Sequence, residues 1–246
     1  MHSLEGIFDR VKRYFRFSMM EIWKYLIIAV VFAFVLSFRE WGVDKLNVIF
    51  GLFNALNAFI IVIMSIMVHE TAHRLYAIHI GYRAEHRSWK LGIFITLFLA
   101  FLTNGVVPFV AYGGVVIHHL AVQRLGKFRY GLNMFDHALI SLMGPMANII
   151  LAMIFKLLMP LNPILIQKAI LINLMLALFN MLPIPPLDGA DVFFASRLLY
   201  VFSAGFMLGI SAMIFYLPGV LYSILVGLGL GAIFWLFFAT KIDKEF

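Results

Sequence analysis

The chain has 246 residues, of which 63% are hydrophobic, 16% aromatic and only 13% charged, and its mean hydropathy is +0.99. A soluble domain is nearer half apolar and a quarter charged, so this composition excludes a soluble, disordered or collagen-like chain and indicates a membrane protein. The formal net charge of +7 then reports topology rather than a nucleic-acid partner, because Lys and Arg accumulate on the cytoplasmic side of membranes. The absence of Cys excludes a disulfide framework and a thiolate metal site.

The first expected element lies within residues 1–20. Leu4, Phe8, Val11 and Phe15 recur there at helical spacing, and basic residues stand between them. This pattern is typical of an amphipathic helix lying on the surface of the lipid bilayer, with a solvated helical tail as the alternative.

Six apolar stretches follow that are long enough to cross a membrane, which takes about 20 residues. They cover residues 22–38, 47–78, 137–159, 164–183, 193–217 and 219–240. The segment 91–117 is also apolar, but it is interrupted by Gly, Asn and Pro and is rich in β-branched residues towards its end. We therefore expect an all-α polytopic membrane protein, a single domain over 1–246, with a membrane-embedded re-entrant β-hairpin between the second and third spans.

Charge counting tests this layout. If the N-terminus is cytoplasmic and 91–117 enters and leaves on one side, all but four of the 19 Lys and Arg residues lie inside. The four outer residues are Arg39, Lys45, Lys156 and Lys168. This asymmetry predicts that both termini are cytoplasmic.

The second span ends in His69-Glu70-Thr71-Ala72-His73. Residues four apart share a helix face, so His69 and His73 can bind one Zn²⁺ through neutral imidazoles. Glu70 lies about 100° around the helix, where it can reach an attacking water as a general base. The alternative is a structural cluster of polar residues at the end of a helix.

Zinc needs a third protein ligand, and Asp188 is the best candidate. It follows a stretch with three prolines, Pro183, Pro185 and Pro186, and precedes Gly189. The alternative for Asp188 is an N-cap, a role that Asp191 can fill instead. The other histidines are poorer candidates: His79 faces away from His73, His137 is expected at the membrane interface, and the remaining four lie in basic or surface segments, namely His2, His86, His118 and His119.

These residues resemble the site-2 protease family of intramembrane zinc metalloproteases. His69-Glu70-x-x-His73 ends one span, and Leu187-Asp188-Gly189 follows an Asn-x-x-Pro run that ends another. Gly144-Pro145-x-x-Asn148 and Tyr112-Gly113-Gly114-Val115-Val116 resemble the helix motif and the Gly-rich strand of the family. The resemblance covers about residues 47–200, the expected catalytic core, and takes a minimal form with neither a PDZ nor a CBS domain. One departure is Ala72, where the family often has Gly.

The resemblance implies one zinc ion per chain, held by His69, His73 and Asp188, with Glu70 as the catalytic base. It implies cleavage of a transmembrane protein substrate and places Asn148 near the zinc, as an aid to the substrate or the oxyanion. A hydrogen bond between helices is the alternative for Asn148, and Gly144-Pro145 is expected to mark a kink. A metal- or proton-coupled transporter and a non-proteolytic zinc membrane protein of the same fold stay open as other functions. The oligomeric state is not predictable.

The Gly-rich segment suggests how a substrate is held. A helical substrate hides its peptide bonds in its own hydrogen bonds, so it must unwind before cleavage, and freed backbone groups are costly in lipid. The strand around Gly113, Gly114, Val115 and Val116 can pair with the unwound backbone. A packed plug is the alternative for this segment.

Overall fold

The computed structural model describes residues 4–42, 45–119 and 133–242. Within these residues, five helices are long and apolar enough to cross a membrane. They are α2 (Met19–Leu36), α3 (Val48–Ile80), α5 (Met134–Leu157), α6 (Pro163–Asn180) and α9 (Val220–Phe237), which continues as the π-helix η2 (Phe238–Ile242). Five of the six predicted spans are helices long and apolar enough to cross a membrane, and their ends differ from the predicted ones by only a few residues.

The sixth predicted span, 193–217, is not one continuous helix. The chain breaks at Ser196 into α7 (Asp188–Ala195) and α8 (Arg197–Met213), and α8 is too short to count among the five. Ser196 is extended, and its hydroxyl accepts a hydrogen bond from the backbone of Leu199, so it caps a new helix rather than continuing the old one. The short helix α1 (Leu4–Tyr14) precedes the first span.

The segment 91–117 also differs from the expected hairpin. Its first half is the helix α4 (Lys90–Leu102), and its second half ends in the strand β2 (Gly113–His119). The partner of β2 is β1 (Tyr82–Ser88), which pairs with it in antiparallel register from Tyr82–His119 to Ser88–Gly113. A strand was not expected at 82–88, and the apolar run from 90 continues as a helix until Asn104 and Gly105 take positive φ angles.

Sequence signals explain where the long helices begin. Side-chain oxygens of Ser18, Asn47 and Asn162 accept backbone hydrogen bonds at the first turns of α2, α3 and α6. Large apolar side chains lie exposed along the first half of α3, including Ile49 and Phe53. In water this exposure would be costly, and it matches a helix that faces lipid, so the chain is a multi-pass membrane protein.

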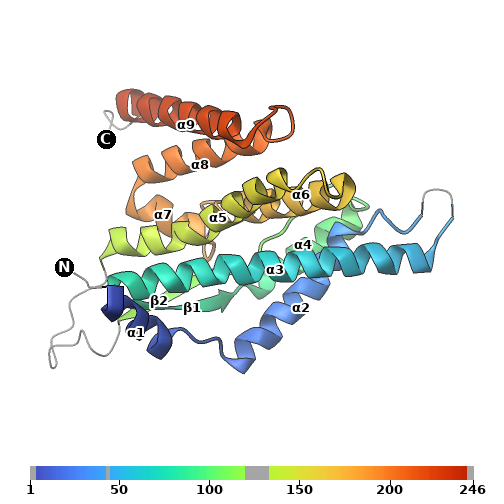
Figure 1. Cartoon of the computed structure of the whole chain (residues 1–246), viewed down its shortest axis with the longest axis horizontal. Coiled ribbons are helices and arrows are strands. Elements are labelled where there is room, and N and C mark those ends of the chain that lie inside the picture. Colours follow the sequence, from blue (N-terminus) through green and yellow to red (C-terminus); the bar gives the residue numbers. More distant parts are fainter. Residues whose placement is uncertain (1–3, 43–44, 120–132, 243–246) are drawn as a thin grey trace.

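Helix α3 runs through the middle of the molecule, with α5 and α6 on one side and α2 and the sheet on the other (Figure 1). Buried side chains of α2, α3 and α6 form one apolar cluster, and those of α5, α6, α7 and α8 form a second. A third cluster packs the sheet against α3 and α5. This arrangement brings the C-terminal half of α3 into contact with the sheet and with α5.

Candidate metal centre

His69 and His73 lie on one face of α3, as their spacing predicts. Both are 2% exposed, and their ring centroids are 4.7 Å apart. Imidazoles are costly to bury without partners, and here two of them are buried side by side at the end of a long apolar helix. Their arrangement points to a shared ligand.

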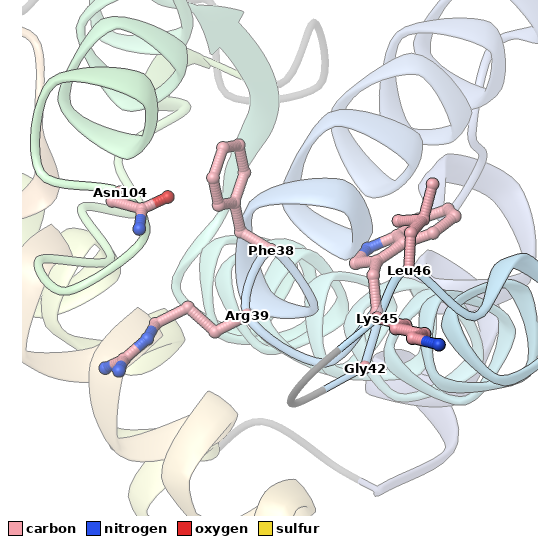
Figure 2. A pocket seen from close by; sticks show the side chains of 7 residues that line it. Phe38, Arg39, Gly42, Lys45, Leu46 and Asn104 are labelled. Atoms are coloured by element: carbon pink, nitrogen blue, oxygen red, sulfur yellow. The ribbon is translucent and has the colours of Figure 1, made fainter.

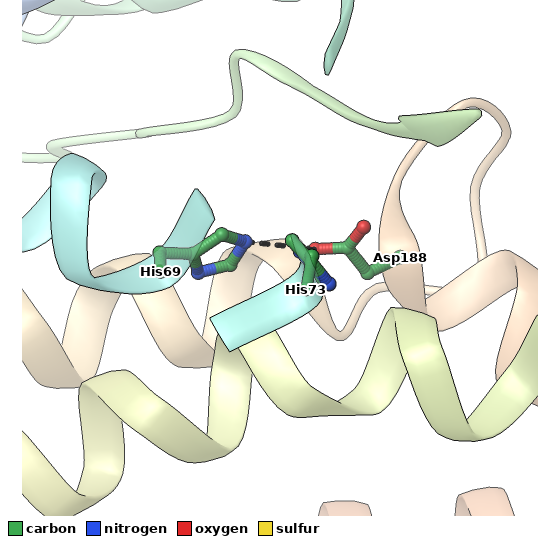
Figure 3. A group of neighbouring side chains, drawn as sticks. All are labelled: His69, His73 and Asp188. Carbon is green, nitrogen blue, oxygen red and sulfur yellow. Dashed lines mark hydrogen bonds and ion pairs between the residues drawn. The ribbon is translucent and has the colours of Figure 1, made fainter. Parts of the chain in front are cut away.

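Asp188 reaches the same place from α7. Its Oδ2 lies 3.0 Å from Nε2 of His69 and 3.4 Å from Nε2 of His73, and the residue is fully buried (Figure 3). Each of the three residues offers a ligand atom, and these atoms all lie within 4.8 Å of one another. Two ligands of one tetrahedral zinc, at 2.0–2.1 Å each, stand roughly 3.4 Å apart, so the separations between Asp188 and the two imidazoles suit a zinc ion.

The surroundings also suit a metal ion. Nδ1 of His73 lies 2.7 Å from the backbone carbonyl oxygen of Ile140, which can only accept, so the proton sits on Nδ1 and Nε2 is left with a free lone pair. Within the described residues, the buried Oδ1 of Asp188 has no hydrogen-bond partner. Groups of this kind need an ion or water to satisfy them.

Gly144 closes the site from α5. A Cβ atom at this position would clash with Nε2 of both His69 and His73. The helix therefore needs glycine here because the ligand atoms of the two imidazoles lie directly against its backbone. The expectation that Gly144-Pro145 marks only a kink is corrected: Gly144 forms a wall of the site.

The segment before Asp188 is packed from two sides. A Cβ on Gly189 would clash with the carbonyl of Met181, and a Cβ on Gly114 would clash with the carbonyl of Pro186. Gly189 is therefore needed for close approach of two backbones, and strand β2 lies directly on the proline-rich segment. Burial alone would raise the pKa of the Asp188 carboxyl, but the neighbouring His73 and the hydrogen bond with His69 hold it below its ordinary value.

Glu70 lies beside this group and is bound by three other side chains. The Tyr25 hydroxyl donates to its Oε2 at 3.1 Å, and Nη1 of Arg74 donates to the same oxygen at 3.2 Å. Nδ1 of His86 lies 3.0 Å from Oε1. The expectation that His86 lies in a surface segment is wrong, because the residue is only 7% exposed.

The remaining sequence candidates fall into two groups. Asn148 is fully buried on α5, one turn beyond Gly144, and its side chain has no hydrogen-bond partner among the described residues. Asp191 does not cap α7, whose N-cap is Leu187; it accepts a hydrogen bond from Ser141 at 3.0 Å and lies 3.4 Å from His137. Asp191 and His137 thus form a separate pair, outside the group of His69, His73 and Asp188.

The predicted substrate strand is β2. Gly113 takes a φ of 152°, and a Cβ there would clash with the carbonyl of Arg87 on the neighbouring strand. Val115 is 7% exposed and pairs with His86, whereas Val116 is half-buried and pairs with Glu85. In the described part of the chain the sheet has two strands, so the outer edge of β2 has no strand beside it.

A cavity of about 500 Å³ lies elsewhere, where α2 ends. Figure 2 shows that the basic side chains of Arg39 and Lys45 in its wall extend in different directions. Basic groups that diverge in this way do not form a joint anion site. This cavity shares no residue with the His69, His73 and Asp188 group.

Comparison with known proteins gives one relative. The chain is 33% identical over 186 residues to a protein of Methanocaldococcus jannaschii whose name reads "Putative zinc metalloprotease", and the match covers 72% of this chain and 85% of the relative. No protein-family model and no solved structure matches the chain.

Proposed function

The chain belongs to the zinc metalloprotease family of its Methanocaldococcus relative, and on that premise we propose that it is an intramembrane protease of the site-2 type. It hydrolyses peptide bonds within or near transmembrane segments of membrane proteins. The observation that carries this proposal is the buried group of His69, His73 and Asp188 at the end of an apolar spanning helix. A metal site at this depth in a lipid-facing fold suits a substrate that is itself in the membrane.

Zinc held by these three residues would act as a Lewis acid and lower the pKa of a water in the open fourth position towards 7. Glu70 accepts the proton of the attacking water and passes it to the leaving amine. The Ile140 carbonyl fixes the tautomer of His73, and Gly144 leaves room beside both imidazoles. Asn148, buried and without a partner in the described chain, donates to the developing oxyanion or the substrate backbone.

A direct experiment tests this function. The purified protein is analysed for zinc per chain and incubated in detergent with a test substrate, a single apolar span of about 20 residues interrupted by a Gly-Pro pair. One zinc per chain is expected, together with cleavage that a chelator abolishes and added zinc restores. Zinc without cleavage of any spanning substrate would favour the non-proteolytic alternative, and metal transport into vesicles would favour the transporter.

Gly144 offers a test of the metal site that leaves every ligand in place. Gly144→Ala is expected to weaken zinc binding roughly 10- to 100-fold, the range seen when the surroundings of a metal are disturbed. Calorimetric titration of the metal-free protein with Zn²⁺ measures the change. Ala favours a helix by about 1 kcal/mol over Gly, so the substitution should not destabilise helix α5. Gly229→Ala, where a Cβ meets nothing within 4 Å, is the matched control and should bind zinc normally.

Strand addition is proposed as the way a substrate is held. The outer edge of β2 can pair with an unwound backbone, and an apolar cavity of about 490 Å³ lies beside Val107 and Pro108, which lead into this strand.

The backbone of Trp89 donates to the carbonyl of Tyr112, so alternate residues from Tyr112, including Val116, point their backbone groups at β1, and Val115 points outward. Val115→Pro removes a donor from the outer edge and is expected to slow cleavage at least tenfold without loss of zinc. Val116→Pro is its counterpart, because the Val116 donor points to β1 and away from the proposed substrate. Unchanged cleavage in both variants, with zinc retained, would contradict strand addition.

Both termini are proposed to be cytoplasmic, which requires the shorter apolar helix α8 to cross the membrane as well, because five crossings would leave the termini on opposite sides. The native chain has no Cys, so single cysteines can be introduced for labelling. Ser88→Cys, at the end of β1, should react with an impermeant reagent from the cytoplasmic side, and Asn162→Cys, the N-cap of α6, should react from the other side. Labelling of both from one side would contradict this orientation.

A further inference from the structure

The Glu70 carboxylate is held from two directions. Its Oε2 faces the helices, where Tyr25 of α2 and Arg74 of α3 donate to it. Its Oε1 faces the sheet, where it lies 3.0 Å from Nδ1 of His86. The two oxygens are therefore fixed by different parts of the fold.

The helix side is held independently of Glu70. Nη2 of Arg74 donates to Oε1 of Glu21 at 2.5 Å and to the Tyr25 hydroxyl at 3.2 Å, and the guanidinium lies 4.1 Å from the centre of the Phe17 ring. Glu21 is itself tied to Ser18 in a capping box at the start of α2. Arg74 is thus anchored to α2 and would keep its place if Glu70 moved.

On the sheet side, His86 contacts the carboxylate. The His86 side chain is completely buried, and its ring stacks on Tyr112 at 5.4 Å and meets the edge of Tyr25 at 5.2 Å. Two aromatic rings therefore set its orientation. An ionised carboxylate can only accept, so the 3.0 Å contact between Oε1 and Nδ1 of His86 is attractive when Nδ1 carries the proton. Neither ring nitrogen of His86 makes a regular hydrogen bond among the described residues, so the 3.0 Å ion-pair contact of Nδ1 with Glu70 is the polar contact of this side chain.

We infer that His86 is a positioning residue for Glu70. Its Nδ1 lies 3.0 Å from Oε1 and attracts it, and this contact restrains a rotation of the carboxylate about its last bond that the donors on Oε2 alone leave free. Because His86 belongs to β1, the strand paired with β2, the sheet that is proposed to hold the substrate also orients the base. The catalytic consequence rests on the proposed function, since a base displaced by about 1 Å costs on the order of 100-fold in rate.

Two amide substitutions separate positioning from simple packing. The side-chain nitrogen of Asn occupies the position of Nδ1 in His, whereas that of Gln corresponds to Nε2. His86→Asn is expected to keep kcat on the test substrate within about fivefold, and His86→Gln to lower it about 100-fold. KM and zinc content should stay unchanged in both. His79→Asn, at an exposed histidine near the end of α3, is the matched control and should behave as the native protein.

The opposite results would overturn the inference. Equal losses in the Asn and Gln variants, or losses confined to KM or zinc content, would mean that His86 only fills space. A double-mutant cycle with His86→Gln and Glu70→Ala, measured by thermal unfolding, detects the contact between the two side chains without an activity assay. Non-additive changes in Tm of about 2 °C or more are expected, and additive changes would overturn the inference. The same cycle with His79→Asn should be additive. If the native protein cleaves nothing, the proposed function fails, and the cycle still decides whether His86 holds Glu70.

Discussion

Glu70→Gln is expected to lower the rate of cleavage about 1,000-fold while one zinc per chain is retained. The amide cannot accept a proton from the attacking water, and general-base catalysis contributes about 10²- to 10⁴-fold. Gln keeps the size of the side chain, and its carbonyl oxygen can still accept from Tyr25 and Arg74, which now bind Oε2. The comparison is made on kcat, with zinc measured in the same preparations.

Glu85→Gln is the matched control for this substitution. Glu85 lies on β1 next to His86, is 43% exposed and pairs with Arg83, so the same chemical change there should leave cleavage unaltered. If Glu70→Gln were fully active, Glu70 would not be the base, and the proposed protease mechanism would have to be abandoned.

The spanning helices were predictable because their signals are local. A continuous apolar run of about 20 residues forms a helix in lipid, because a helix satisfies its backbone hydrogen bonds internally. Ser18, Asn47 and Asn162 mark where such runs begin. The break at Ser196 was missed because the apolar run continues on both sides of it. A single extended serine that caps the following helix is a weak signal within a hydrophobic stretch.

The sheet was harder to predict because its two strands are far apart in sequence. Residues 82–88 are mostly polar or charged and so resemble a surface loop. Every second residue from Tyr82 is nonetheless buried or half-buried, and Tyr82, Ala84 and His86 face inwards. This alternation was the signal that could have placed His86 in the interior. Pairing with β2 supplied the rest, and no local pattern specifies it.

The group of His69, His73 and Asp188 followed from chemistry as much as from pattern. Ionisable residues are so costly in a membrane span that two histidines one turn apart call for a ligand. The spacing could not reveal Gly144, because the requirement for glycine comes from atoms of another helix. Contacts to Glu70 from Tyr25 and His86 are likewise tertiary, as these residues lie on separate elements.

Asp188→Ala is expected to release the zinc and abolish cleavage. Zinc sites in small peptides bind with about 10–16 kcal/mol, so one of four ligands accounts for roughly 3 kcal/mol, a hundred- to thousand-fold in affinity. Asp188→Asn should act in the same direction, because an amide lacks the negative charge but fills nearly the same buried space. Zinc per chain after dialysis against a weak chelator is the measurement, and the Tm of the metal-free proteins shows whether the fold persists.

Asp191→Ala tests whether the third ligand has been correctly assigned. Asp191 lies three residues further along α7, also carries a carboxylate, and is engaged with Ser141 and His137 instead of His69. The Asp191→Ala variant should therefore keep one zinc per chain under the conditions in which the Asp188→Ala variant loses its zinc. The reverse pattern, zinc retained without the Asp188 carboxylate and lost without that of Asp191, would move the third ligand to Asp191. Because Oδ2 of Asp188 lies within 3.4 Å of both imidazole Nε2 atoms, we expect zinc binding to depend on Asp188 and not on Asp191.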